Sequence, residues 1–208
     1  MRILLVSCYE LGHQPLAVAA PLAFLERAGF AAEALDISVE QFEAGKSAGA
    51  GLVAISVPMH TALRLGVRVA EQIRRINPGG HICFYGLYAS LNAEYLLAHC
   101  CDSVIGGELE SALVALAEAL AAGRTGAVEG VHLRDHAARP VLERLSFPLP
   151  SRGALPPLKK YAHLEKDGRK DLVFLEVAKN HLDVVMYDKP HKLVPANRWQ
   201  VFEERTFR

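Results

Sequence analysis

The amino-acid sequence predicts an α/β fold with a doubly wound, five-stranded parallel sheet, followed by a C-terminal extension. Short apolar runs alternate with helical patterns through the first 122 residues. The runs are apolar at nearly every position, which is typical of parallel strands covered by helices on both faces. Connections between them are short, and right-handed crossovers then favour the flavodoxin-like strand order 2-1-3-4-5.

The first elements are a strand, a helix and a second strand. Arg2 to Ser7 (RILLVS) is an almost unbroken apolar run. A helical pattern covers Leu16 to Ala28 and ends at Gly29, a residue suited to a C-terminal cap. Pro21 lies within that pattern and lacks an N–H, so the helix is expected to start late or to kink there. Ala31 to Asp36 reads as the second strand.

The middle of the chain continues the alternation. Leu52 to Val57 is the third strand, and a helix follows from Ala62 to Ile76, stopped by NPGG. Apolar positions form one stripe of this helix and charged positions face water. The remaining predictions are strands at His81–Tyr85 and Ser103–Ile105, and helices at Asn92–Ala98 and Leu109–Ala122.

Three segments are predicted along the chain. Residues 1–123 form the α/β domain, and residues 124–170 form a small hairpin and a proline-rich connector, SFPLPSRGALPPL. Residues 171–208 form a tail with strand-like runs at Asp171–Val177 and His181–Tyr187.

Composition limits the classes of function. The 208 residues carry 23 basic and 23 acidic side chains, so non-specific nucleic-acid binding has no global electrostatic support. No apolar stretch is long enough to span a membrane. Four cysteines without a Cys-x-x-Cys pair indicate a reducing compartment, and a cytoplasmic location is expected: Cys8, Cys83, Cys100 and Cys101.

Four loops leave the carboxyl ends of the predicted strands, where open parallel sheets bind ligands. Gly86 and Gly106 stand at the exits of the fourth and fifth strands, and the hydroxyl of Ser56 ends the third. Glycine removes a Cβ and exposes N–H groups, so this edge is expected to accept an extended group pressed against backbone. The alternative is that both glycines only form turns.

Signatures of other nucleotide-binding folds are missing from these loops. No Gly-x-Gly-x-x-Gly follows the first strand, and no Walker-type phosphate loop is present. The loop CYELGHQP supplies only Gly12 for an FMN phosphate. The third strand ends in Ser56, where a phospho-receiver would have an aspartate.

Several segments in order resemble a known family: RILLVS, PLAVAAPLAFLERAGF, LVAISVPMHTAL, ICFYGLYAS and DSVIGGELESALVALAEAL. Together they are similar to the cobalamin (B12)-binding domain at the N-terminus of cobalamin-dependent radical SAM proteins. The resemblance covers residues 1–122 and implies a Rossmann-like B12-binding fold with a corrinoid tail inserted at the carboxyl edge. The implied cofactor-binding residues are Gly12, His13, Ser56, Val57, Pro58, His60, Thr61, Tyr85, Gly86, Tyr88, Ala89, Gly106, Gly107 and Glu108.

The sequence departs from that family in two ways. The motif Asp-x-His-x-x-Gly is absent, and His13 stands out of register, so His13 and His60 are only weak candidates for a cobalt ligand. The barrel's Cys-x-x-x-Cys-x-x-Cys is also absent, since every cysteine lies before residue 102. No [4Fe–4S] cluster, and no autonomous radical SAM catalysis, is therefore expected of this chain.

Three hypotheses for the function remain open. The first is a corrinoid-binding module, either a truncated or frame-shifted product or a stand-alone carrier, that presents cobalamin to a partner enzyme or barrel domain. The second is an enzyme domain that binds a nucleotide or sugar nucleotide, although Glu10, Glu108 and Glu110 are interpreted as charges at helix N-termini. The third is a degenerate interaction module using Trp199 and Phe202. The oligomeric state is not predicted.

Overall fold

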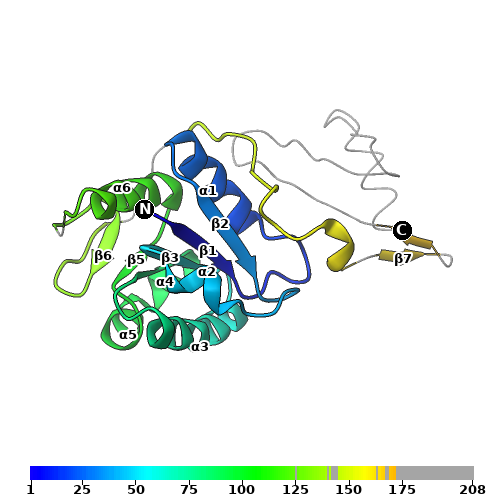
Figure 1. Cartoon of the computed structure of the whole chain (residues 1–208), viewed down its shortest axis with the longest axis horizontal. Helices are drawn as coiled ribbons and strands as arrows, with labels where there is room; N and C mark the ends of the chain where they lie inside the picture. Colours follow the sequence, from blue (N-terminus) through cyan, green and yellow to red (C-terminus); the bar gives the residue numbers. More distant parts are fainter. Residues whose placement is uncertain (125, 140, 142–144, 163, 167–168, 172–208) are drawn as a thin grey trace. The chain divides into compact units, whose positions relative to one another are not determined.

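A computed structural model describes residues 1–124, 126–139, 141, 145–162, 164–166 and 169–171. These fall into two compact units, 1–156 and the part from 157 onward. In the first unit a twisted sheet lies between two layers of helices (Figure 1). Within the described residues, every helix is too short or too polar to cross a bilayer.

The sheet has the order β2-β1-β3-β4-β5-β6, which confirms the predicted order 2-1-3-4-5. The five parallel strands are β1 (Ile3–Ser7), β2 (Ala32–Asp36), β3 (Leu52–Ser56), β4 (His81–Tyr85) and β5 (Ser103–Ile105). The addition of a sixth strand to this sheet was not predicted. β6 (Val131–Leu133) pairs antiparallel with β5 and comes from the segment expected to form a hairpin.

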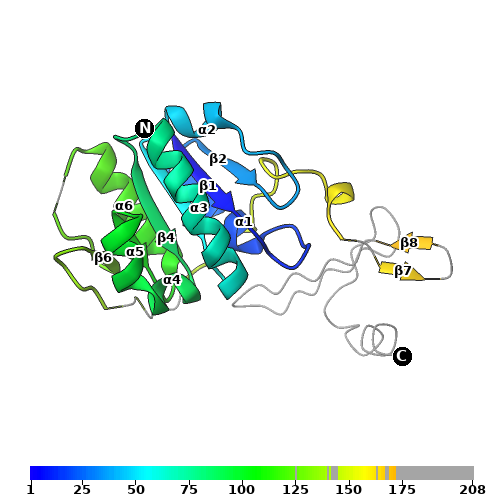
Figure 2. The same ribbon diagram turned by 90° about the horizontal axis from the view of Figure 1, so that it is seen from below.

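Helices cover both faces of the sheet (Figure 2). α1 (Leu16–Arg27) and α6 (Leu109–Ala121) pack on one face, against side chains such as Leu5, Ala54 and Cys83. The alternate side chains, such as Val6, Ile55 and Phe84, face α3, α4 and α5. Successive strand residues point to opposite faces, so apolar runs rather than alternating patterns supply both cores.

Helix boundaries differ from the expectation in the second half of the sheet. α3 (His60–Ile76) begins two residues earlier than predicted, and two short helices, α4 (Leu87–Leu91) and α5 (Ala93–His99), replace the single one. Leu87 can begin a helix directly because Gly86, its N-cap, has a φ of +105° that turns the chain sharply out of β4. α2 (Ala44–Ala48) was not predicted.

Pro21 lies inside α1 and neither delays its start nor ends it. A proline at this position cannot donate to the carbonyl of Ala17, four residues earlier. The hydroxyl of Tyr85 donates to that carbonyl at 2.8 Å instead. A buried side chain from β4 therefore supplies the hydrogen bond that the proline removes from the helix.

Residues 146–156, here called the strap, lie along α1 (Figure 1). The ring of Phe147 packs edge-on against Phe24 at 5.3 Å between centroids. The Ser151 N–H donates to the Ala19 carbonyl at 2.9 Å, and Leu155 is buried in the same core as α1. This proline-rich segment is therefore part of the first unit.

The second unit has little described structure. A 3-10 turn covers Leu158–Lys160, and a two-stranded hairpin consists of β7 (Leu164–Lys166) and β8 (Arg169–Asp171). The predicted strand-like runs after Asp171, and both Trp199 and Phe202, lie outside the described residues.

Candidate functional site

The five parallel strands end in one row. Ser7 pairs with Asp36 on one side and with Ser56 on the other, and Ser56 pairs with Tyr85, which pairs with Ile105. Of the seven buried polar or charged residues in the described part of the chain, five lie in this row, in the loop after β1 or at the start of α6: Ser7, Gln14, Asp36, Ser56 and Glu110. Polar groups are costly to bury, so this concentration marks the carboxyl edge as the candidate site.

The loop after β1 places a carboxyl group at this edge. The backbone N–H groups of Leu16 and Ala17, in the first turn of α1, hydrogen-bond to the side chain of Glu10. Its second oxygen, Oε2, is buried and has no hydrogen-bond partner among the described residues. Burial, reinforced by the charge of Asp36, raises the pKa of Glu10 to about 7, although Arg152 and the two N–H groups oppose the shift.

A buried hydroxyl network connects β3, β4 and α1. Ser56 hydrogen-bonds to the hydroxyl of Tyr85, which itself donates to the Ala17 carbonyl. Burial raises the pKa of Tyr85 well above its usual value, and the charges of Glu10 and Glu110 act in the same direction. Tyr85 is therefore a neutral hydrogen-bonding group at neutral pH and occupies the layer between the sheet and α1.

Gly86 has a conformational requirement of its own. Its φ is +105°, and a Cβ added there would lie 3.0 Å from the carbonyl oxygen of Val57. The Gly86 N–H donates to Ile105, and the Tyr88 N–H donates to Val57. The turn itself thus accounts for glycine, so close approach of a ligand is not needed to explain it.

The loop after β5 is also filled partly by the protein. A Cβ at Gly106 would lie 2.6 Å from the Ser90 hydroxyl oxygen, so α4 packs directly over this glycine. Gly107 has a φ of +69° and is exposed, and the Glu108 N–H donates to the Val141 carbonyl at 2.9 Å. The outer part of this loop, rather than Gly106, is open to a ligand.

The remaining predicted residues divide into inner and outer positions. Val57 and Ala89 are fully buried in the core between the sheet and helices α3 to α5, on the opposite face from the Tyr85 hydroxyl, and Pro58 and Tyr88 are partly exposed. Gly12 has a φ of +79° in the loop after β1, next to the exposed His13. His60 and Thr61 are exposed on the first turn of α3 and line a small pocket on the outer surface of that helix.

Sequence reasoning missed the acidic and amide groups at this edge. Asp36 and Ser7 are the last residues of their strands, and a polar residue at the end of an apolar strand could have been recognised in the sequence as part of the sheet edge. Gln14 gives no local signal, because its partners come from the strap: Nε2 donates to the Pro156 carbonyl at 2.9 Å, and Oε1 accepts from Arg152 at 2.7 Å.

The sequence also contains Gly45-Lys46-Ser47, a fragment of a phosphate-loop pattern. Glu40 stands where a Walker-type loop has its first glycine. In the structure the tripeptide forms most of α2, and the Lys46 ammonium lies 3.4 Å from the Ala34 carbonyl. This segment is therefore not a nucleotide phosphate site.

The thiol beside the carboxyl edge is not a nucleophile at neutral pH. Cys8 is the thiol closest in sequence to this edge, and burial, with the charge of Asp36, raises its pKa to about 12, so it carries no thiolate at neutral pH. What remains is a set of neutral donors and acceptors together with the buried carboxyl groups of Glu10, Asp36 and Glu110. Such a lining matches a large ligand with many uncharged polar groups.

Comparisons with known proteins found matches to the fold of this chain. The family model described as the B12 binding domain matches residues 2–117, more than half of the chain. None of the curated proteins matches the chain. Two solved structures of TsrM, a radical S-adenosylmethionine methyltransferase from Kitasatospora setae, have a similar fold, with a TM-score of 0.55 and 22% identity.

One TsrM structure holds tryptophan substrate and the SAM analogue aza-SAM, and the other holds cobalamin and a [4Fe–4S] cluster. The similarity covers 62% of this chain and 28% of that one. The chain therefore spans less than a third of the length of that relative.

Proposed function

This chain belongs to the B12-binding domain family and is a cobalamin-binding module, and we propose that the loops after β1, β3, β4 and β5 hold its corrinoid. The observation that carries this placement is the gathering of buried polar side chains at the carboxyl edge. Ligands of open α/β sheets bind at this edge, outside the carboxyl ends of the strands.

The chemistry of this edge fits the cofactor. A corrinoid carries many neutral amide side chains, which need both donors and acceptors. The buried Oε2 of Glu10 has no partner among the described residues and can accept from an amide N–H. Exposed backbone at Gly107 and the side chains of Pro58 and Tyr88 offer further contacts on neighbouring loops.

Most of the predicted residues have a proposed place around the cofactor. The inner wall of the proposed site consists of Ser56, Val57, Tyr85 and Ala89. Hydrogen bonds of Tyr85 with Ser56 and with Ala17 hold α1 against the sheet behind this wall. Gly12, Gly86, Gly106, Gly107 and Glu108 shape the rim. When bound, cobalamin supplies a cobalt centre able to carry a methyl group, while the residues of this chain bind and orient it.

Two exposed histidines are the proposed cobalt-ligand candidates. If one of them is the axial ligand, electron paramagnetic resonance of bound cob(II)alamin should show nitrogen splitting from its imidazole, and His13→Ala or His60→Ala should remove that splitting. His99→Ala, at the opposite edge of the sheet, is the matched control. Unchanged spectra in both variants would exclude both histidines.

We further propose that a barrel domain or partner enzyme covers this edge. Leu11, Leu87 and Leu91 are 62%, 64% and 70% exposed, and all three lie on loops or helices that leave the carboxyl ends of strands. The similarity to a chain more than three times the matched length supports a second domain as occupant. Four free thiols support a reducing, cytoplasmic location.

A spectrophotometric titration of the full chain with hydroxocobalamin tests the proposed site. We expect a shift of the visible bands and cofactor retained after desalting. Glu10→Gln should weaken binding about 10-fold, as for loss of a hydrogen bond to a charged group. Glu71→Gln, an exposed carboxylate on α3 away from this edge, is the control. Retained cobalamin with equal affinity in both variants would refute the placement at Glu10.

A nucleotide site is the competing outcome of the same titration. Tight binding of a nucleotide or sugar nucleotide, with no retention of hydroxocobalamin, would replace the corrinoid proposal by the second hypothesis.

A further inference from the structure

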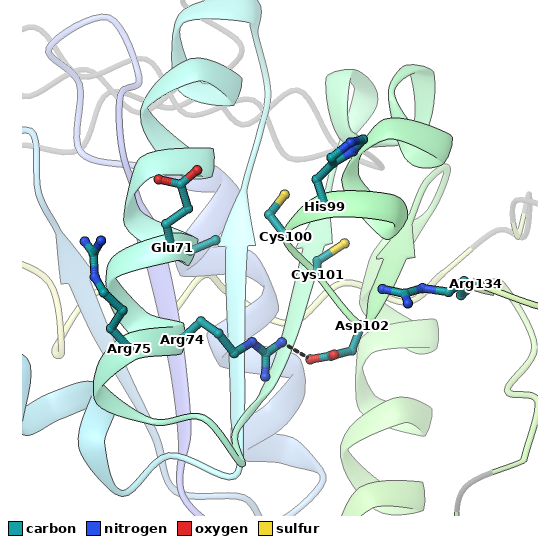
Figure 3. A pocket seen from close by; sticks show the side chains of 9 residues that line it. Glu71, Arg74, Arg75, His99, Cys100, Cys101, Asp102 and Arg134 are labelled. Carbon is teal, nitrogen blue, oxygen red and sulfur yellow. Dashed lines mark hydrogen bonds and ion pairs between the residues drawn. The ribbon is translucent and has the colours of Figure 1, made fainter.

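A polar pocket lies at the amino edge of the sheet, away from the proposed corrinoid site. Its cavity of about 410 Å³ is lined by the C-terminal half of α3, by the turn between α5 and β5, and by Arg134 (Figure 3). Because β4 and β5 begin here, none of the loops proposed to hold cobalamin contributes to this pocket. Its volume is in the range of small-molecule sites.

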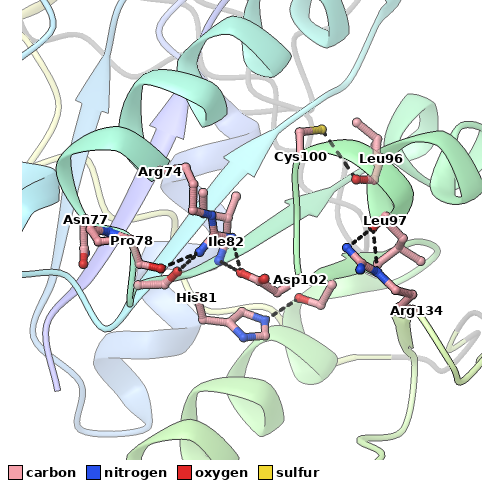
Figure 4. A network of polar contacts seen from close by, with 12 residues as sticks. Arg74, Asn77, Pro78, His81, Ile82, Leu96, Leu97, Cys100, Asp102 and Arg134 are labelled. Atoms are coloured by element: carbon pink, nitrogen blue, oxygen red, sulfur yellow. Dashed lines mark hydrogen bonds and ion pairs between the residues drawn. The ribbon is translucent and has the colours of Figure 1, made fainter.

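One wall of the pocket is a rigid ion pair. Arg74 Nη2 lies 2.6 Å from Asp102 Oδ2, which also accepts from the Ile82 N–H at 2.7 Å. Arg74 Nη1 donates to the carbonyls of Pro78 and Gly80 at 3.2 and 2.8 Å (Figure 4). These bonds fix the guanidinium in place, and Asp102 cancels its formal charge.

The opposite wall carries a charge that is not cancelled. Arg134 donates from Nε and Nη2 to the carbonyl of Leu97, near the end of α5, at 3.2 and 3.0 Å. A carbonyl fixes the side chain without neutralising it, and no carboxylate pairs with Arg134 in the described part of the chain. Figure 3 shows Arg74 and Arg134 reaching toward Asp102 from opposite sides. The third guanidinium of the lining, Arg75, is exposed at the rim, and Glu71, one turn earlier on α3, carries the opposite charge.

The two cysteines of the lining do not supply reactive chemistry. Burial, reinforced by the charge of Glu71, raises the pKa of Cys100 to about 11, and burial raises the pKa of Cys101 further. Both are therefore neutral thiols at neutral pH. Among the described residues no set of three or more His, Cys, Asp and Glu side chains is arranged to hold a metal. The pocket is left with hydrogen bonding and a net positive charge.

We propose that this pocket binds the oxyanion group of a small phosphorylated or carboxylated molecule, with Arg134 as the principal cation and Arg74 as a positioned second donor. A guanidinium held by a backbone carbonyl keeps donors for a planar oxyanion, the geometry in which arginine binds phosphate and carboxylate. The neutral thiols and the stem of Arg74 line the space beside it. The inference is independent of cobalamin binding.

Nuclear magnetic resonance titration of the full chain tests this site. Inorganic phosphate and pyrophosphate serve as phosphate probes, and citrate serves as a carboxylate probe. We expect saturable amide shifts confined to the turn at residues 99–102 and to Arg134. Saturation by the phosphates alone, or by citrate alone, would support the site and identify the class of its ligand.

Substitutions separate a built site from diffuse surface charge. Arg134→Gln should weaken the tightest probe at least about 10-fold, and Arg134→Lys should weaken it less, because lysine keeps the charge without the planar donors. Arg64→Gln, an exposed arginine of α3 outside this pocket, is the matched control and should bind normally. Equal effects of Arg134→Gln and Arg64→Gln, or no saturation by any probe, would overturn the proposal. Unchanged melting temperatures of the variants would show that they are folded.

Discussion

At the residue scale, Tyr85 connects the sheet edge to a defect in α1. Pro21 leaves the Ala17 carbonyl without its helical donor, and the Tyr85 hydroxyl donates to that carbonyl. Tyr85→Phe should therefore lower the free energy of unfolding by about 1–3 kcal/mol, the cost of a buried carbonyl that has lost its partner. Chemical denaturation measures this loss.

A double-mutant cycle identifies the cause of that loss. Pro21→Ala restores an N–H for the Ala17 carbonyl, so Tyr85→Phe should cost less in the Pro21→Ala background than in the natural chain. Equal costs in both backgrounds would show that the Tyr85 hydroxyl acts through Ser56 alone.

Glu10 predicts a pH dependence of stability. Burial raises its pKa from 4.5 to about 7, so the folded state favours the protonated carboxyl group. The stabilisation is complete below about pH 4.5 and is lost as the pH rises through about 7, which lowers the free energy of unfolding by on the order of 1–3 kcal/mol. Glu10→Gln should flatten this change between pH 4.5 and 8 in denaturation experiments. An equally steep change in the variant would assign it to other groups.

Strand-end positions were predictable from the sequence, but their neighbours were not. Ser56, Tyr85 and Gly86 follow from the apolar run that precedes them, because a buried strand must end at the sheet edge. The pKa of Glu10 is raised by burial and by the charge of Asp36 and is opposed by Arg152, and both charged residues are far away in the sequence. No local pattern reveals such long-range partners.

At the element scale, the strap is held to α1 by both polar and aromatic contacts. Arg152 and Pro156 bind Gln14, which is buried just before α1, and Phe147 packs on Phe24. Phe147→Ala should cost about 3 kcal/mol or less, because only the strap loses packing, and should expose the strap to protease. Limited proteolysis would show cleavage within residues 146–156 in the variant first. Leu149→Ala, a 92% exposed position of the strap, is the control.

The elements that sequence patterns misplaced are short and held by tertiary contacts. β6 has three residues and exists as a strand because β5 offers it an unpaired edge. The division into α4 and α5 occurs at Asn92, whose side chain donates to the Tyr88 carbonyl at 2.7 Å and so ends α4 locally. The five parallel strands fall in the regular alternation of strand and helix patterns, and β1 to β5 were therefore predicted within a residue.

At the scale of the whole molecule, cobalamin should stabilise the fold in proportion to its concentration. A ligand at about 100 times its dissociation constant adds about 2.7 kcal/mol to the folded state. For a unit of this size that corresponds to a rise of about 5–10 °C in melting temperature. Thermal unfolding followed by circular dichroism, with and without hydroxocobalamin, measures it. A constant melting temperature would contradict binding to the native state.

The packing of the strap on α1 determines where the chain can be cut to give a shorter fragment of the first unit. A fragment that ends near residue 117, at the end of the family match, would lose Phe147 and Leu155. An apolar strip beside Phe24 and Leu22 would then be exposed to solvent. Such a fragment should aggregate in solution. Cutting after residue 156 keeps that strip covered and gives the better starting point for crystallisation or fusion.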